Sequence, residues 1–169
     1  MYLNYYESAF PVFASSDGIA YEIYLAGCHG YCPGCHSPHT WDFNAGIPMQ
    51  EEIEKLVKDM ENREDQFDNI VILGGEPLDN FQWEIENFAA TLRECFPDKK
   101  LYLYTHFDED TVRDRFPFVL DYFDYIKVGM YDSDSLNKEN KKDPLTNVIL
   151  ASNNQYFIAG NPVKEKANE

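Results

Sequence analysis

The feature that most constrains the fold is a short apolar run that ends in two glycines, NIVILGG at residues 69–75. A continuously apolar strand of this length is typical of a parallel sheet that is buried on both faces. Parallel strands cannot be joined by a tight turn, so each pair needs a crossover connection, which is usually a helix. The run therefore predicts an α/β fold with helical crossovers.

The rest of the chain alternates between strand and helix patterns. Further strands are predicted at 19–27, 100–105, 125–130 and 154–160. Helices are predicted at 48–60, 79–96 and 108–116. Right-handed crossovers favour an open α/β sheet or a partial (β/α) barrel, and a whole eight-fold barrel would need about 250 residues. We therefore predict one small domain over residues 1–169, a partial (β/α) barrel with a mostly parallel sheet and a polar tail at about 161–169.

The charge balance restricts the partners. With 14 basic and 30 acidic residues, the formal net charge of −16 repels both a phosphate backbone and an anionic membrane surface. No apolar run approaches the roughly 20 residues of a membrane span, and the first ten residues lack the basic flank of a secretory signal. We therefore expect a cytoplasmic protein that binds neither nucleic acid nor membrane.

Three of the four cysteines lie in the loop GCHGYCPGCHSPH, residues 27–39, directly after the first of these predicted strands. Its C-x-x-C-H pattern would suit haem attachment, which requires export, and its CPGC would suit a redox dithiol, which normally opens a helix. Both interpretations leave Cys28 without a role. The fourth cysteine, Cys95, lies on the apolar face of a predicted helix, and we expect it to pack in the core.

Two metal interpretations use all three cysteines of the loop. Zinc would take Cys28, Cys32 and Cys35 together with one of three nearby histidines, His29, His36 or His39. A four-iron cluster on the same thiolates would keep one iron without a protein ligand, and that iron can bind a substrate or cofactor. Structural zinc usually stabilises folds that are short of core, which weakens the zinc interpretation without excluding it.

A second motif, ILGGEPL at residues 72–78, lies at the carboxyl end of a predicted strand, where parallel sheets place their ligand sites. Gly74 and Gly75 let the backbone approach a ligand closely, and Glu76 can accept a hydrogen bond from an ammonium group. Alone, this motif is equally well explained as a turn between strand and helix.

Together the two motifs resemble the radical S-adenosylmethionine superfamily. Within it, the CPGCH run, TWDFNAG at 40–46, ILGGEPL and SNNQ at 152–155 are similar to the anaerobic ribonucleoside-triphosphate reductase activating proteins. The resemblance covers about residues 20–155 and is dense only at these motifs. Many superfamily members carry an aromatic residue directly before the third cysteine, and Gly34 at that place is similar to the reductase-activating subgroup.

The resemblance implies a set of site residues. Cys28, Cys32 and Cys35 would ligate a [4Fe-4S] cluster. Gly74, Gly75 and Glu76 would bind the methionine moiety of S-adenosylmethionine, and Thr105 is a further polar contact. Lys127 and Gly129 are weaker ones, and strand alternation could equally make Lys127 a surface residue. Tyr31, Trp41 and Phe43 are aromatic residues near the loop that either contact adenine or pack in the core. We expect the three loop histidines to hydrogen-bond the cluster sulfurs or a partner.

The implied activity is reductive cleavage of S-adenosylmethionine, followed by formation of a glycyl radical on the catalytic subunit of the anaerobic (class III) ribonucleotide reductase. An external electron donor such as flavodoxin would reduce the cluster. Radical chemistry belongs to the cofactor, so no acid–base pair or nucleophile is expected. Three alternatives remain: activation of another glycyl-radical enzyme, an enzyme of modified-nucleoside synthesis, and a zinc-stabilised binding module without catalysis.

Overall fold

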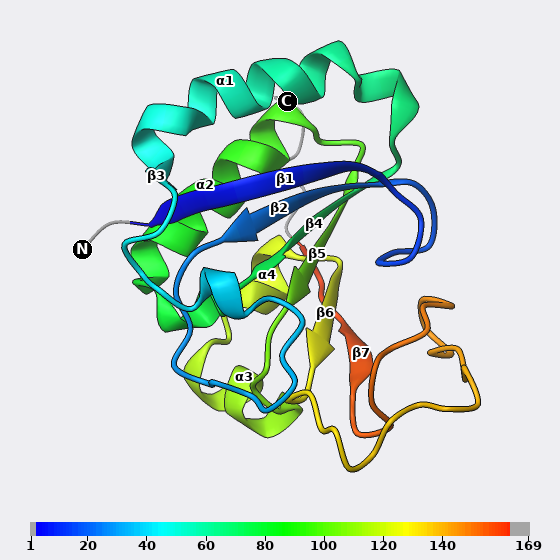
Figure 1. Cartoon of the computed structure of the whole chain (residues 1–169). Coiled ribbons are helices and arrows are strands. Elements are labelled where there is room, and N and C mark those ends of the chain that lie inside the picture. The colour runs from blue at the N-terminus through cyan, green and yellow to red at the C-terminus, as the bar shows by residue number, and fades with distance from the viewer. Residues whose placement is uncertain (1–2, 163–169) are drawn as a thin grey trace.

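The structure, a computed structural model, describes residues 3–162. Its strands form one seven-stranded sheet in the order β3-β1-β2-β4-β5-β6-β7 (Figure 1). The strands are β1 (Asn4–Val12), β2 (Ala20–Leu25), β3 (Ile47–Pro48), β4 (Asn69–Gly74), β5 (Lys100–Tyr104), β6 (Tyr125–Val128) and β7 (Tyr156–Ala159). The α-helices are α1 (Met49–Asn62), α2 (Gln82–Cys95), α3 (Glu109–Arg115) and α4 (Val119–Tyr122). Three short 3-10 helices are η1 (Pro38–Thr40), η2 (Glu64–Gln66) and η3 (Pro77–Asp79).

The centre of the sheet is parallel, as predicted. β2, β4, β5 and β6 pair in parallel, and the connections between them contain α1, α2 and the α3–α4 pair. Because parallel strands point the same way, their carboxyl ends meet at one edge of the sheet. The cysteine loop leaves β2 at this edge, and the Gly-Gly-Glu motif ends β4 there.

Both faces of the central sheet are buried, but by different kinds of structure. Ile70 and Ile72 of β4 point into the larger core, which also holds apolar residues of α1 and α2; both helices lie over this face (Figure 1). Val71 points to the other face and packs in a smaller cluster with Val148 and Leu150, which come from the segment between β6 and β7. A polar-rich loop thus covers the face that has no helices.

The outer strands correct the sequence prediction. β1 has no counterpart among the predicted strands, yet it pairs antiparallel with β2 and with β3. β7, which was predicted, also pairs antiparallel, with β6. The sheet is therefore mixed rather than mostly parallel. Since β3 and β7 are its two ends, the sheet is open, and the description as a partial barrel is not confirmed.

The helix boundaries differ slightly from the predicted ones. The helix predicted from residue 79 begins at Gln82, because Pro77–Asp79 form the short helix η3 instead. The Glu76 side chain caps η3 by accepting a hydrogen bond from the backbone N–H of Leu78. The helix predicted from Pro48 begins one residue later, with Pro48 as its N-cap. Residues 163–169 of the predicted polar tail lie outside the described residues, and the single-domain boundary at 1–169 stays a prediction. No helix within residues 3–162 is long and apolar enough to cross a bilayer.

Candidate metal centre

A cavity of about 860 Å³ lies at the carboxyl edge of the parallel strands. The residues of both sequence motifs line it. They are Cys28, Cys32 and Cys35 from the loop after β2, and Gly74, Gly75 and Glu76 from the end of β4. Thr105, which follows β5, and Lys127 of β6 also line the cavity, so four successive parallel strands contribute to one site.

The three loop cysteines have the features of metal ligands. All are free thiols, Cys28 is buried and the other two are partly exposed. The backbone N–H of Gly30 donates to Cys28 Sγ at 3.2 Å, and that of Ser37 donates to Cys35 Sγ at 3.4 Å. Such bonds favour the thiolate form that an iron–sulfur cluster requires. Burial, however, raises the pKa of the Cys28 and Cys32 thiols, so a bound metal must supply the compensating positive charge.

Main-chain hydrogen bonds hold the two motifs together. The N–H of Glu76 donates to the carbonyl of Gly27 at 2.7 Å, and the N–H of Gly75 donates to that of Leu25 at 2.9 Å. A Cβ atom on Gly75 would lie 2.3 Å from the Gly27 oxygen, and Gly74, with φ of +119°, would place one 2.4 Å from the Leu25 oxygen. Both glycines are therefore needed for the approach of β4 to the cysteine loop, in addition to the approach to a ligand that the sequence predicts.

Glu76 is 1% exposed and has its carboxylate fixed by neighbouring donors. Oε1 accepts from the N–H of Leu78 at 3.0 Å and from the Thr105 hydroxyl at 2.7 Å, and Oε2 accepts from the N–H of His106 at 2.6 Å. Burial raises the pKa of Glu76, and the nearby His106 ring and these hydrogen bonds oppose the rise. A carboxylate offers about four acceptor sites. Glu76 thus has room for one further donor, such as a ligand ammonium.

Thr105 and Lys127 both line the cavity, and the polar atoms of both are bonded to neighbouring residues. The Thr105 hydroxyl donates to Glu76 and accepts from the N–H of Phe107 at 3.2 Å, so it orients the carboxylate; its contact with a cofactor stays a prediction. Lys127 is only 7% exposed, and its Nζ donates to the Gly129 carbonyl at 3.0 Å. Burial lowers the pKa of Lys127 to about 8. Gly129 is an acceptor at the site's edge and does not line the cavity.

The aromatic and histidine residues of the loop divide between the cavity and its surroundings. Trp41 and His36 line the cavity. Tyr31 packs edge-on against Trp41 at a centroid distance of 4.9 Å and is 56% exposed, whereas Phe43 packs against His29 at 4.7 Å. His39 lies 3.7 Å from Glu7, outside the cavity. Only one of the three loop histidines therefore faces the site.

Two ionisable residues beside Cys28, His106 and Asp79, are absent from the sequence prediction. His106 lines the cavity, and its Nδ1 lies 3.4 Å from Glu76 Oε2. Asp79 in η3 accepts from the N–H of His29 at 2.9 Å. A single histidine directly after Thr105, at the end of a predicted strand, is the one signal that could have indicated His106. Cys95, by contrast, packs against the core from α2 and does not line the cavity, as predicted.

The family model described as "4Fe-4S single cluster domain" matches residues 15–157, which contain every element of this site. The chain belongs to this family. Family membership supports the iron–sulfur interpretation of the loop over haem, a dithiol or structural zinc. The assignment of Cys28, Cys32 and Cys35 as the individual ligands stays a prediction; it is consistent with the position of all three side chains on one cavity.

Curated relatives are activating proteins. The chain is 24% identical over 163 residues to the anaerobic ribonucleoside-triphosphate reductase-activating protein of Pasteurella multocida, covering 92% of this chain and 99% of that one. The protein of the same name from Escherichia coli K12 is 25% identical over 136 residues, 78% of this chain and 87% of its own. The pyruvate formate-lyase-activating enzyme of Listeria monocytogenes is 30% identical over 74 residues, 43% and 30% of the two chains. No solved structure gives a significant match.

The hydrogen bond from Thr105 to Glu76 should contribute measurably to the free energy of unfolding. We expect Thr105→Val, which keeps the shape but removes the hydroxyl, to lower the free energy of unfolding by about 1–3 kcal/mol, because the buried Glu76 carboxylate loses one of its donors and the N–H of Phe107 loses its acceptor. Thr105→Ser keeps the donor and should lose less. Urea unfolding of the two variants measures the difference, and equal stabilities would show that this bond does not hold Glu76.

Proposed function

We propose that this protein cleaves S-adenosylmethionine reductively at a [4Fe-4S] cluster and generates a glycyl radical on the catalytic subunit of an anaerobic ribonucleoside-triphosphate reductase. The observation that carries the proposal is the convergence of Cys28, Cys32 and Cys35 with Glu76 on one cavity. The names of the relatives that match over most of the chain support the protein target.

The residues at the cavity suit the two ends of an amino acid moiety. Glu76, a buried acceptor with unused capacity, would bind the ammonium of the cofactor's methionine group. Lys127, a buried amine that lines the same cavity, would bind its carboxylate or face the cluster. A cluster held by Cys28, Cys32 and Cys35 would supply the one-electron reduction that cleavage of a sulfonium requires, and Glu76 and Lys127 would hold the methionine group beside it.

The remaining volume and the surface suit a protein substrate. The cavity extends from the cysteine loop to Leu136, Ile149 and Leu150 in the segment after β6, so it is longer than the metal centre alone. Leu136 and Ile149 are 38% and 46% exposed at its rim. A glycine-bearing loop of a partner would cover these apolar side chains and exclude water from the radical.

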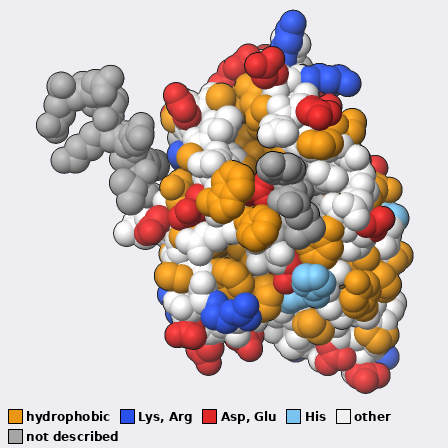
Figure 2. Space-filling model, turned by 90° about the vertical axis from the view of Figure 1, so that its left-hand side faces the viewer, with side chains coloured by type: hydrophobic (Ala, Val, Ile, Leu, Met, Phe, Trp, Pro, Cys, Tyr) orange, Lys and Arg blue, Asp and Glu red, His pale blue; other side chains and the backbone are white. Residues whose placement is uncertain are grey.

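Other features of the surface are in keeping with a protein partner. Figure 2 shows hydrophobic side chains exposed among acidic ones on the face that lies at the left in Figure 1. The acidic side chains reflect the net charge of −16. A flavodoxin-like donor, the cytoplasmic location and the partial-barrel description remain part of the proposal.

A second candidate target is another glycyl-radical enzyme, because the chain also matches a pyruvate formate-lyase-activating enzyme over part of its length. That match covers 43% of this chain, whereas two of the reductase-activating relatives match 92% and 77% of it. The longer matches make the reductase the preferred target. No structural observation favours modified-nucleoside synthesis.

The ligand assignment is tested by cysteine substitution. We expect Cys28→Ala, Cys32→Ala and Cys35→Ala each to abolish cleavage of S-adenosylmethionine, because each would remove one of the three thiolates that hold the cluster. Cys95→Ala is the matched control and should keep both iron content and cleavage, with a small loss of stability. Methionine release under reductant measures the effect, and full cleavage by any one triplet variant would show that the assignment is wrong.

The target is tested by electron paramagnetic resonance. The reconstituted protein is incubated anaerobically with reductant, S-adenosylmethionine and the host's anaerobic reductase subunit, and in parallel with a pyruvate formate-lyase. We expect a glycyl doublet on the reductase subunit and none, or far less, on the lyase. The reverse preference would replace the reductase by another glycyl-radical enzyme as target, and cleavage without any protein radical would contradict the activase function.

A further inference from the structure

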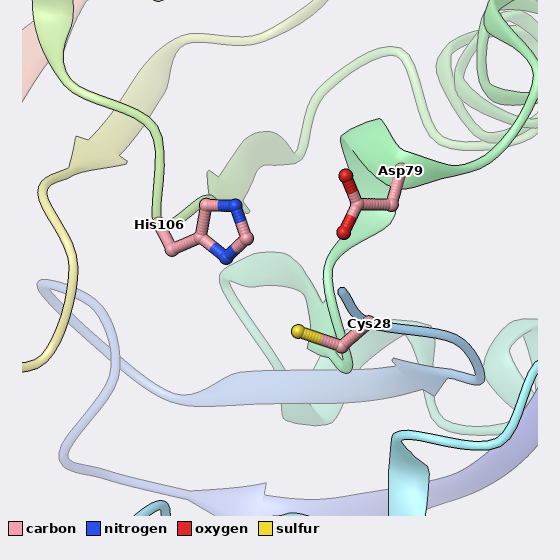
Figure 3. Close-up of side chains that lie close together, drawn as sticks. All are labelled: Cys28, Asp79 and His106. Atoms are coloured by element: carbon pink, nitrogen blue, oxygen red, sulfur yellow. The ribbon is translucent and has the colours of Figure 1, made fainter. Parts of the chain in front are cut away.

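Three side chains from three successive strand ends meet beside the cysteine loop (Figure 3). Cys28 follows β2, Asp79 belongs to η3 after β4, and His106 follows β5. One ligand atom of each lies within 4.8 Å of the other two. Only Cys28 belongs to the cysteine triplet, so this group is not the proposed cluster ligand set.

We propose that Cys28, Asp79 and His106 form a second, mononuclear metal site that takes one Zn²⁺ ion in the cluster-free protein. Sulfur, imidazole nitrogen and carboxylate oxygen are the ligands that zinc binds, at about 2.0–2.3 Å. In a tetrahedral site, two such ligands lie about 3.3–3.6 Å apart. The three atoms therefore need only small side-chain rotations to enclose the ion, and the cavity leaves the fourth position to water.

Each of the three ligands also has an outer partner that orients it. The Gly30 N–H donates to Cys28 Sγ, and the His29 N–H donates to the Asp79 carboxylate. Glu76 Oε2 lies 3.4 Å from Nδ1 of His106 and accepts from the backbone N–H of the same residue, so it fixes the position of the imidazole ring. Outer carboxylates commonly orient histidine ligands of metals. The three side chains are thus partly preorganised without metal.

The zinc site and the cluster exclude one another, because both use the Cys28 thiolate. On binding zinc, the Cys28 thiol would release its proton to solvent, and the triplet would lose one of its three ligands. The zinc-bound protein would be unable to accept a cluster until the ion is removed. This site differs from the zinc alternative raised by the sequence, which used all three cysteines and a loop histidine.

The test uses the full chain, freed of iron by chelation under anaerobic conditions and titrated with Zn²⁺ against a chromogenic chelator. The double variant Cys32→Ser/Cys35→Ser lacks two cluster ligands but keeps the proposed zinc ligands. We expect it to bind one Zn²⁺ per chain with wild-type affinity. His106→Ala and Asp79→Ala should each weaken Zn²⁺ binding by at least about tenfold. Loss of a residue that only orients a metal ligand already lowers metal affinity by about this factor, and loss of the ligand itself should lower it more. His39→Ala is the control, because His39 lies outside the cavity, and it should bind normally.

Cobalt and thermal melting separate loss of the site from loss of the fold. Co²⁺ bound to the Cys32→Ser/Cys35→Ser variant should show a thiolate-to-cobalt charge-transfer band, and the further change Cys28→Ser should remove it. Metal-free melting temperatures of the His106 and Asp79 variants should stay near that of the wild type. The proposal is overturned if the double variant binds no zinc, or if folded His106→Ala binds it as tightly as wild type. Either result leaves the glycyl-radical assay, and thus the activase function, unaffected.

Discussion

The site depends on one main-chain contact, the hydrogen bond from the N–H of Glu76 to the carbonyl of Gly27 at 2.7 Å. It joins the end of β4 to the first residue of the cysteine loop. The bond can form because Gly75 has no Cβ, which would otherwise lie 2.3 Å from the same oxygen. The parallel pairing of β2 with β4 brings the two strand ends side by side, and this bond fixes the carboxylate beside the thiols.

The polar contacts at this edge of the sheet form a connected layer behind the cavity. Thr105 and His106, at the end of β5, both donate to Glu76, and the His106 ring then faces Cys28. A change at β5 would therefore affect both the carboxylate proposed to bind the cofactor and a proposed metal ligand. In the proposed account, the same strand ends present three thiolates to a cluster and, without the cluster, three different ligands to a single ion.

Local pattern was enough to predict the central strands and the two motifs that line the cavity, but not the first strand of the sheet. NIVILGG is buried on both faces, so its apolar run is unambiguous, and the Gly-Gly-Glu and cysteine motifs mark their strand ends directly. β1 is half-exposed along most of its length and is defined by pairing with β2, which local pattern does not reveal. Asp79 and His106 were missed because an isolated acid or histidine has no period or spacing; only the fold brings them to Cys28.

The central claim is that three cysteines hold a four-iron cluster and leave one iron to the ligand that Glu76 helps to bind. Mössbauer spectroscopy of the ⁵⁷Fe-reconstituted protein, recorded before and after addition of S-adenosylmethionine, tests it most directly. The account predicts that the signal of about one iron in four shifts when the cofactor is added, and that Glu76→Gln weakens the concentration dependence of this shift. Iron signals that do not respond to the cofactor would contradict it.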